Sequence, residues 1–456
     1  MKRPSLNHTY RLVWRARQQG YVAVPECAKG GGRSGRILIA SALMAPLLAV
    51  SAPTDGVVSS GSATISHNGT VTNIDQGSQK AVINWQGFSV GANEVVNFRQ
   101  PNSSAITLNR VIGNEKSVID GVLNANGRVF LVNSSGVLFG QGASVNVGGL
   151  IASTLDITDD DFHAGRYVFK SDSGTGSVVN RGAITATEGG VIALLGNTVS
   201  NQGVVVATKG TVALAAGNKI TLNFNGDALL SVTLDEGTLH ALVENQQAIY
   251  ADGGTVLLTA QAADDLLGAQ VNNSGLVQAR TVDDLKGSIT LYAHGGTALV
   301  DGTLDASAPS RGDGGFIETS GALVSVADTA TLTTRAALGR HGSWLIDPTN
   351  FTIAYGSGGQ TSSSIGVTTL QSALANGNVS IATQSAGSEA GDININAALT
   401  WSAANNLTLT AAGNINANAV RHTSENHNSR LMQGTCWSAG CHEAPHGSNA
   451  NYHFRY

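Results

Sequence analysis

The residues that suggest metal chemistry gather near the C-terminus of the sequence, at Cys436, Cys441, His442 and His446. Thiolates and imidazoles are common zinc ligands, but structural zinc sites usually take ligand pairs from two separated halves of a chain. Here all four side chains fall within one short segment. We therefore expect no metal site and no bound cofactor, and we expect this segment to be a disordered tail.

Carboxylates are the other candidates for chemistry. The acidic run Asp159–Asp161 lacks the Gly-Gly-x-Gly-x-Asp repeat of calcium-binding β-rolls, so we expect it to be a solvated loop. Asp301 and Asp305 have a spacing at which two carboxylates can act together on one coil of a β-helix. Asp at Gly-rich corners, however, more often shapes turns. No Ser-His-Asp grouping stands out by spacing, and we predict that the protein is not an enzyme.

The composition favours short strands over helices. Charged residues make up 12% of the chain, against roughly 25% in an average soluble domain, and 56 residues are glycine. Few charges and abundant small residues suit stacked strands with tight corners. The net charge is -5 and no broad basic patch exists beyond the N-terminus, so we expect no nucleic-acid partner.

An internal repeat supports this interpretation. The phrase that begins at Asn180 recurs 21 residues later at Asn201, and a third copy begins at Asn273. Such a period fits one coil of a β-helix, with coils about 4.8 Å apart. It is too short for a propeller blade of about 40–45 residues, and the spacing of a leucine-rich horseshoe is missing.

Three segments depart from the simple repeat. Residues 222–252 break the period, which suggests a hairpin or loop outside the coils, and the repeats resume at Gly254. In Val191–Leu195 both alternating positions are apolar. This indicates either a coil wall covered on its outer side or an Ala/Leu-rich strand, and both interpretations remain open. Thr369–Ala375 has the pattern of one short helix.

The segment from Ile83 to Thr154 contains short β-rich runs separated by Asn-Gly, Ser-Gly and Gly-Ala turns. Its motifs are INWQGFSVG (Ile83–Gly91), LNRVIG (Leu108–Gly113), NANGRVFLVN (Asn124–Asn133), SSGVLFG (Ser134–Gly140) and GGLIAST (Gly148–Thr154). In these motifs the chain resembles the secretion domain of two-partner-secreted exoproteins, the filamentous-haemagglutinin-like family of Gram-negative bacteria. The family usually has Asn-Pro-Asn-Gly-Ile where this chain has Asn-Ser-Ser-Gly-Val, from Asn133. The resemblance extends, less densely, to about Asn418.

Repeat and resemblance together predict an all-β fold, a right-handed parallel β-helix with an N-terminal antiparallel β-cap and small hairpins outside the helix. Repeat folds need caps to protect their first strands. The resemblance also implies a partner, an outer-membrane transporter with a β-barrel and periplasmic domains. We expect recognition by this partner, or the folding coupled to it, to depend on Asn84, Trp85, Phe88, Asn109, Arg110, Asn124, Asn126, Gly127, Asn133, Gly136 and Gly140.

Residues 1–52 have the features of an extended signal peptide. A basic region is followed by the apolar run Ile37–Val50 and by small residues, which is the pattern of a secretory leader. The run is too short for a membrane span of about 20 residues. We expect cleavage in the region of Val50 and Ala52, after passage through the general secretion machinery of the inner membrane. The front part resembles the signal extension of large exoproteins.

The sequence therefore divides into four parts. We expect the signal peptide at 1–52, the two-partner secretion domain at 53–310, further β-helix repeats at 311–418, and a non-repetitive tail at 419–456 that is disordered or frame-shifted. The expected function is that of a secreted or surface-exposed adhesin, in full or shortened form, with a receptor on a host-cell or bacterial surface. The alternatives are the delivery stem of a contact-dependent inhibition toxin and a β-helix carbohydrate-active enzyme.

Overall fold

The structure is a computed structural model, and it describes residues 52–171, 176–264, 268–356 and 362–419 together with four short outlying strands. Two of these strands, β1 (Tyr10–Arg15) and β2 (Gly20–Pro25), pair antiparallel within a separate unit, Met1–Ala49. All other elements belong to a second unit, Val50–Tyr456. No helix among the described residues is long and apolar enough to cross a membrane.

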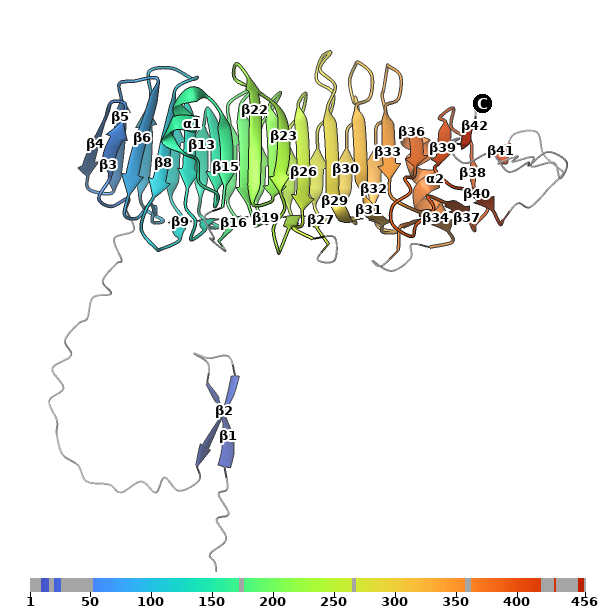
Figure 1. The fold of residues 1–456 in the computed structure, drawn as a ribbon, viewed down its shortest axis with the longest axis horizontal. Coiled ribbons are helices and arrows are strands. Elements are labelled where there is room, and N and C mark those ends of the chain that lie inside the picture. Colours follow the sequence, from blue (N-terminus) through green and yellow to red (C-terminus); the bar gives the residue numbers. More distant parts are fainter. Residues whose placement is uncertain are drawn as a thin grey trace, which may run out of the picture. The chain divides into compact units, whose positions relative to one another are not determined.

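The second unit begins with an antiparallel cap (Figure 1). Strand β3 (Val57–Ser60) pairs antiparallel with β6 (Lys80–Trp85), and β4 (Ala63–Asn68) pairs antiparallel with β5 (Val71–Gln76). Strands β5 and β6 then pair parallel with strands of the first full coil. The cap therefore satisfies the first edges of the helix, as predicted.

The coils that follow stack as a parallel β-helix with three faces. The first face contains β6, β8 (Ile106–Val111), β11 (Arg128–Val132), β14 (Gly149–Ser153), β18 (Val191–Gly196), β21 (Thr211–Ala216), β26 (Thr255–Gln261), the first parts of β29 (Ser288–Val300) and β31 (Phe316–Val326), β33 (Ser343–Asp347), β36 (Asn378–Ala382) and β39 (Leu407–Ala411).

The second face runs beside it in the same continuous sheet. It contains β9 (Ser117–Ile119), β12 (Val137–Phe139), β16 (Ser177–Asn180), β19 (Thr198–Asn201), β24 (Leu242–Asn245), β27 (Gln270–Asn273), the later parts of β29 and β31, β35 (Ser364–Gly366), β34 (Phe351–Ala354), β37 (Ile393–Ile395) and β40 (Ile415–Ala417).

The third face is a separate sheet of eleven strands. After β4 and β5 it contains β7 (Val95–Arg99), β10 (Val122–Ala125), β13 (Ser144–Val147), β17 (Ala183–Ala186), β20 (Val204–Val206), β25 (Ala248–Tyr250), β28 (Leu276–Gln278), β30 (Thr303–Asp305) and β32 (Thr331–Thr333). Beyond β32 the helix α2 (Val367–Asn376) packs with buried Leu370 and Leu374. The predicted helix at Thr369–Ala375 is thereby confirmed, with slightly wider bounds.

The register confirms the repeat. Ala183 on β17 pairs with Val204 on β20, 21 residues later. Inward side chains form one continuous apolar core along the coils, while outward side chains on the second and third faces are mostly half-exposed or exposed. Alternation on these two faces therefore follows the period of two that a half-buried strand requires.

The first face is different, because part of its outer side is covered. Helix α1 (Asp159–Ala164) and an antiparallel sheet of β15 (Tyr167–Lys170), β22 (Lys219–Asn225) and β23 (Ala228–Glu236) lie over it. Between this layer and the coils lies a second apolar cluster that includes Phe130 and Phe169. All five residues of Val191–Leu195 are buried, so the outer cover explains their double apolar pattern.

Two expectations were wrong in part. Asp159–Asp161 is the first turn of α1 and not a solvated loop. The excursion is shorter than residues 222–252: the hairpin ends with β23, and β24 and β25 are already coil strands, paired parallel with β19 and β20. Asn245 on β24 is a further copy of the repeat phrase, which was hidden because Gln247 stands where the other copies have glycine.

Two other strands pair with the last coils. Strand β38 (Thr400–Trp401) pairs antiparallel with β41 (Arg430–Leu431), and β39 pairs antiparallel with β42 (Ala450–Phe454). The remainder of the tail, including Cys436, Cys441, His442 and His446, lies outside the described residues.

Candidate transporter-recognition site

Helix α1 forms because its two ends are capped locally. Thr158 adopts an extended backbone, and its side-chain oxygen accepts a hydrogen bond from the backbone amide of Asp161 at 3.1 Å. Three aspartates in the first turn stabilise the positive end of the helix dipole. Gly165 ends the helix at φ 75°, a left-handed conformation that favours glycine. The six-residue helix then depends on tertiary contacts to stay in place.

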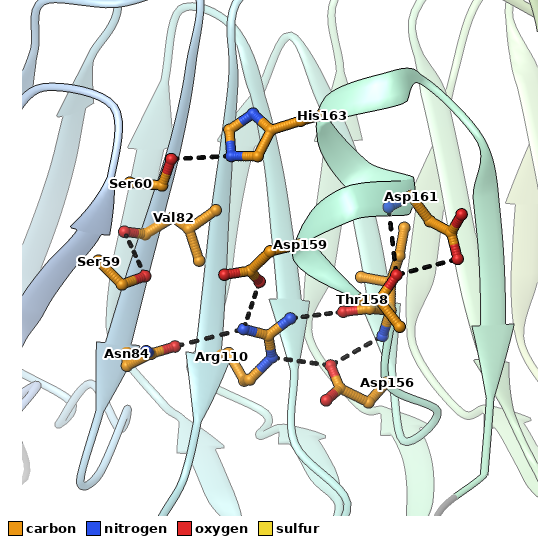
Figure 2. A network of polar contacts seen from close by, with 11 residues as sticks. Ser59, Ser60, Val82, Asn84, Arg110, Asp156, Thr158, Asp159, Asp161 and His163 are labelled. Atoms are coloured by element: carbon orange, nitrogen blue, oxygen red, sulfur yellow. Dashed lines mark hydrogen bonds and ion pairs between the residues drawn. The ribbon is translucent and has the colours of Figure 1, made fainter.

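Arg110 supplies the main contact at the N-terminal end of α1 (Figure 2). Its guanidinium donates to Asp156 Oδ1 at 2.9 Å, to Asp159 Oδ1 at 2.8 Å and to the carbonyl oxygen of Ile157. The Oδ1 atom of Asn84 accepts a further, longer bond at 3.5 Å. Burial disfavours the charge of Arg110, but the two aspartates outweigh it and raise the pKa above its ordinary value.

Lys80 and His163 hold the other end of α1. The Nζ atom of Lys80 donates to the carbonyl oxygens of Phe162 and His163, at 2.7 and 3.1 Å, in the last turn of the helix. Burial lowers the pKa of Lys80. His163 in turn contacts Ser60 of the cap strand β3, with 2.8 Å between Nε2 and Oγ. The helix is thus fastened both to the coils and to the cap.

The side chains of Trp85, Phe88 and Asn109 are buried in the interior of the β-helix. Trp85 is fully buried, and its indole N–H donates to Asn109 Oδ1 at 3.0 Å. Its ring meets Phe88 edge to face, with centroids 5.4 Å apart. Both aromatic residues belong to the main core of the β-helix. A partner cannot touch these three side chains in the folded protein.

Asn124, Asn126 and Gly127 lie on the third face and at its corner. The side-chain amide of Asn124 donates to Asn97 Oδ1 at 3.0 Å. Asn126 exchanges two hydrogen bonds with the backbone of Gln100, at 2.7 and 2.8 Å, which ties two coils together. A Cβ on Gly127 would come within 2.7 Å of the backbone oxygen of Ala105, so only glycine fits there.

Asn133, Gly136 and Gly140 shape the corner between the first and second faces and the strand that follows it. Buried Asn133 accepts a bond from the amide of Ser135 at 2.9 Å and donates to Ser117 Oγ at 3.0 Å. Gly136 has φ 118°, a left-handed conformation that favours glycine. The turn therefore forms without the Pro-Asn pair that the family usually carries.

The structure does not bring the predicted recognition residues into one patch. Trp85, Phe88, Asn109 and Asn133 are buried, while Asn84 and Arg110 lie beside α1 on the first face and Asn124 lies on the third. The sequence analysis did not predict the polar network around α1, to which Asp156, Asp159, Lys80 and His163 belong. A signal for the helix was present, since Thr158 stands three residues before an aspartate and Gly165 follows, which is a capped-helix pattern.

The remaining candidate sites are the signal cleavage region, a metal site and the carboxylate pair Asp301 and Asp305. Ala52 is half-buried, and Val50 lies outside the described residues. Among the described residues, no group of three or more His, Cys, Asp or Glu side chains is placed to hold a metal ion. Asp305 accepts a hydrogen bond from the amide of Ser307 at 2.9 Å, which is turn chemistry.

The fold and this clamped helix define a capped parallel β-helix with an additional layer on one wall. The family model for the TPS secretion domain matches residues 49–305, and the model for the Extended Signal Peptide of Type V secretion system matches residues 7–53. The first match covers more than half of the sequence. The chain therefore belongs to the TPS secretion domain family, the domain of two-partner secretion.

Relatives in Haemophilus influenzae agree with this assignment. A "Heme/hemopexin-binding protein" is 37% identical over 243 residues, which cover 48% of this chain and 26% of that protein. The protein of the same name from strain ATCC 51907 / DSM 11121 / KW20 / Rd is 34% identical over 241 residues, with 51% and 26% covered. The match thus spans about a quarter of these relatives. The crystal structure of the HMW1 secretion domain superposes with a TM-score of 0.60 at 24% identity, covering 81% of this chain and 97% of that one.

The chain is accordingly a secreted exoprotein with a signal extension. It passes through the periplasm and the outer membrane to the cell surface or beyond. The predicted family, the β-helix fold and the extracellular location are confirmed.

Proposed function

We propose that the exported protein is an adhesin, which binds a receptor on a host-cell or bacterial surface through the outer sides of its coils. The observation that carries the proposal is the match of the secretion domain to residues 49–305 on a β-helix that continues beyond the match to about Asn418. The coils after residue 305 lie outside the matched secretion domain, and they add exposed surface to the β-helix. The leader engages the general secretion machinery of the inner membrane.

Heme or hemopexin binding is not transferred from the named relatives. The similarity covers 48% of this chain and about a quarter of those proteins. The delivery stem of a contact-dependent toxin and a carbohydrate-active enzyme stay as alternatives. For the enzyme, the nearest feature is the pair Glu318 and Asp347 on β31 and β33, where burial and the neighbouring Glu318 raise the pKa of Asp347.

The test is co-expression of the full chain with its partner transporter. We expect the protein in the medium or on the cell surface only when the transporter is present, and we expect the purified product to adhere to cells. Secretion without adherence to any of a panel of epithelial and bacterial cells would remove the adhesin proposal. Release of reducing sugar ends from surface glycans would favour the enzyme instead.

We also propose that the partner recognises the chain through the members of the predicted set that are not buried: Asn126, which is exposed, and Asn84, Arg110 and Asn124, which are half-buried. The buried members act through folding. The variants Asn133→Asp and Gly136→Asp test the turn that these two residues form. A carboxylate at position 133 disturbs a buried amide site, and a side chain at position 136 disturbs a left-handed backbone. Secretion of both variants at the normal level would argue against a role of this turn in export.

A further inference from the structure

A groove on the later coils is separate from the clamped helix. It has a volume of about 760 Å³ and lies where successive coils turn from the third face into the first. Its walls include Lys286, Asp313, Arg340 and His341, and Phe316 and Asn378 line it as well. The groove extends beyond the matched secretion domain, since most of these residues follow residue 305.

Glycines form the floor of the groove. Gly287, Gly315 and Gly342 stack on successive coils, and a Cβ on Gly315 or Gly342 would lie 2.2 or 2.0 Å from the backbone oxygen of the glycine one coil before. No side chain can therefore fill the corner. The loops that precede these glycines project beside it with their charged residues, so a shallow channel runs along the stack of coils.

The charges at this corner follow a pattern that is broken at the groove. On earlier coils one acid receives one cation of the next coil, as in Asp252 with Arg280 at 2.8 Å and Asp283 with Arg311 at 2.5 Å. Asp313 instead receives two cations. Lys286 Nζ lies 3.0 Å and Arg340 Nη2 lies 2.9 Å from its Oδ2 atom. Among the residues that line the groove, two cations therefore face one acid.

Both cations are well placed to meet a ligand. The side chain of Arg340 is 87% exposed and that of Lys286 is 54% exposed. Hydrogen bonds from the backbone and guanidinium of Arg340 and from Lys286 hold the pKa of Asp313 well below its ordinary value, so this acid stays ionised and fixes both cations. His341, whose ring contacts Asn405 Oδ1 at 3.0 Å, adds a polar group beside them.

The uncharged side chains that line the groove indicate which class of ligand it fits. Phe316 offers an aromatic ring, and Ser288, Ser343 and Asn378 offer hydroxyl and amide groups. Strands β29, β31 and β33 are paired on both sides, so an extended peptide cannot add to them as a strand. A single excess charge is too little for nucleic acid, whose binding depends on many phosphate contacts. An aromatic ring, amides, hydroxyls and a guanidinium fork together suit a sugar that carries an acidic group.

We propose that this groove binds an acidic oligosaccharide, with Lys286 and Arg340 on the carboxylate or sulfate and Phe316 against a sugar ring. The inference rests on the proposed adhesin function, and it names the chemistry of one receptor for it. The shared chemistry has two sources, carboxylated and sulfated sugars.

The experiment uses the full secreted protein and fluorescent oligosaccharides of matched length in an anisotropy titration at low salt. The probes are hyaluronan (carboxylate only), heparin (mainly sulfate) and dextran (neutral). We expect binding of at least one acidic probe and none of dextran. The double variant Lys286→Gln with Arg340→Gln should bind about tenfold more weakly, as loss of charge-assisted hydrogen bonds predicts. Binding by hyaluronan alone identifies the carboxylate as the group recognised, and binding by heparin alone identifies the sulfate.

Arg335→Gln is the matched control, because Arg335 is exposed on the same loop and does not line the groove. Its affinity should stay within about twofold of the parent. Equal binding by the parent and the double variant, or no binding of either acidic probe, would overturn the proposal. Cell adherence is measured on the same preparations: adherence that survives the double variant leaves the adhesin function standing and removes the groove, whereas sugar binding without adherence does the reverse.

Discussion

Arg110 and Arg99 carry the same charge in different surroundings. Arg110 has a side chain only 15% exposed and meets two aspartates and a backbone carbonyl. Arg99 is 63% exposed and meets only Asp75, at 3.2 Å. Exposed ion pairs contribute little to stability. Removal of a half-buried charge costs more, because its former partners are then left without a hydrogen bond. The position of α1 should therefore depend on Arg110 far more than the third face depends on Arg99.

Arg110→Gln should lower the free energy of unfolding by about 2 kcal/mol, and Arg99→Gln by less than about 0.5 kcal/mol. Urea denaturation of the purified secreted protein measures both. Hydrogen–deuterium exchange over residues 156–170 should accelerate in Arg110→Gln alone, because α1 then loses its main contact at that end. Unchanged exchange in this segment would mean that the helix is held by its apolar contacts and not by the ion pairs.

Single residues also show where sequence reasoning succeeds. Trp85 is predictable as a core residue, because strand alternation decides which side chains face inward. Phe88 follows the strand, and only its large apolar ring indicates that it is buried. The role of Arg110 was predicted only as part of a motif. Its partners Asp156 and Asp159 lie 46 and 49 residues away in the sequence, so no local pattern joins them. The acidic run was assigned to a loop because charge outweighed the capping signal of Thr158.

At the level of elements, two asparagine ladders run along the coils. The inner ladder joins Asn180, Asn201, Asn245 and Asn273 through amide hydrogen bonds of 2.7–2.8 Å, and all four are buried. The outer ladder lies on the third face and includes Asn97, which donates to Asn73 at 3.1 Å in a half-exposed setting. The two ladders both join amides of successive coils, but the outer bonds are longer, at 3.0 and 3.1 Å, and they are open to water. A buried amide without a partner costs more than an exposed one.

Asn201→Ala should therefore lower the free energy of unfolding by about 2 to 3 kcal/mol, because it leaves the amides of Asn180 and Asn245 without their partners. Asn97→Ala, on the outer ladder, should cost less than about 1 kcal/mol, since water replaces the lost bonds. Thermal and urea unfolding of the two variants give the comparison. Equal losses would show that the inner ladder has no special weight.

The interrupted repeat shows the limit of prediction at this scale. Three copies of the phrase were recognised from Asn, a variable residue and Gly. The copy at Asn245 escaped because Gln247 replaces the glycine, although β24 pairs in full register with β19. The hairpin of β22 and β23 is inserted between two coils and separates this copy from the one before it in the sequence. The two copies nevertheless pair on neighbouring coils. A period can be predicted from the sequence only where no element is inserted between two coils.

The acid and cation pairs at the corner predict a response to pH. Burial raises the pKa of Asp252, but hydrogen bonds from Arg280 and Gln278 outweigh it and leave the pKa below its ordinary value. A carboxyl with a depressed folded pKa stabilises the protein above its unfolded pKa, and the stabilisation is lost as the pH falls through the folded pKa. The loss should therefore begin below about pH 4.

Asp252→Asn removes this contribution, which we expect to be about 1 kcal/mol at neutral pH. Its unfolding midpoint should lie below that of the parent at pH 7, and the two should converge as the pH drops below the ordinary pKa of aspartate. Chemical denaturation in a series of buffers measures the difference. Asp75→Asn is the control, because its pair with Arg99 is exposed. A constant difference at all pH values would contradict the assignment.

At the level of the whole molecule, export and folding make opposite demands on the chain. We propose that the secreted chain stays unfolded until it leaves the outer membrane, whereas each coil gains stability by stacking on a neighbour. Residues 53–435 contain no cysteine, although the periplasm favours disulfides. Hydrogen-bond ladders, glycine corners and small ion pairs hold the coils instead, and all of these form without a covalent step.

This view predicts that a single covalent loop blocks export. Thr185 on β17 and Val206 on β20 lie in register on neighbouring coils and face outward, at a separation that suits a disulfide. The variant with both residues changed to Cys, in a background with Cys436→Ser and Cys441→Ser, should accumulate in the periplasm when co-expressed with the transporter. Each single cysteine variant should be secreted normally, because it closes no loop. Addition of a membrane-permeant reductant should restore export of the double variant. Full secretion of the oxidised double variant would show that the transporter accepts a folded pair of coils, and the absence of cysteine would then need another cause.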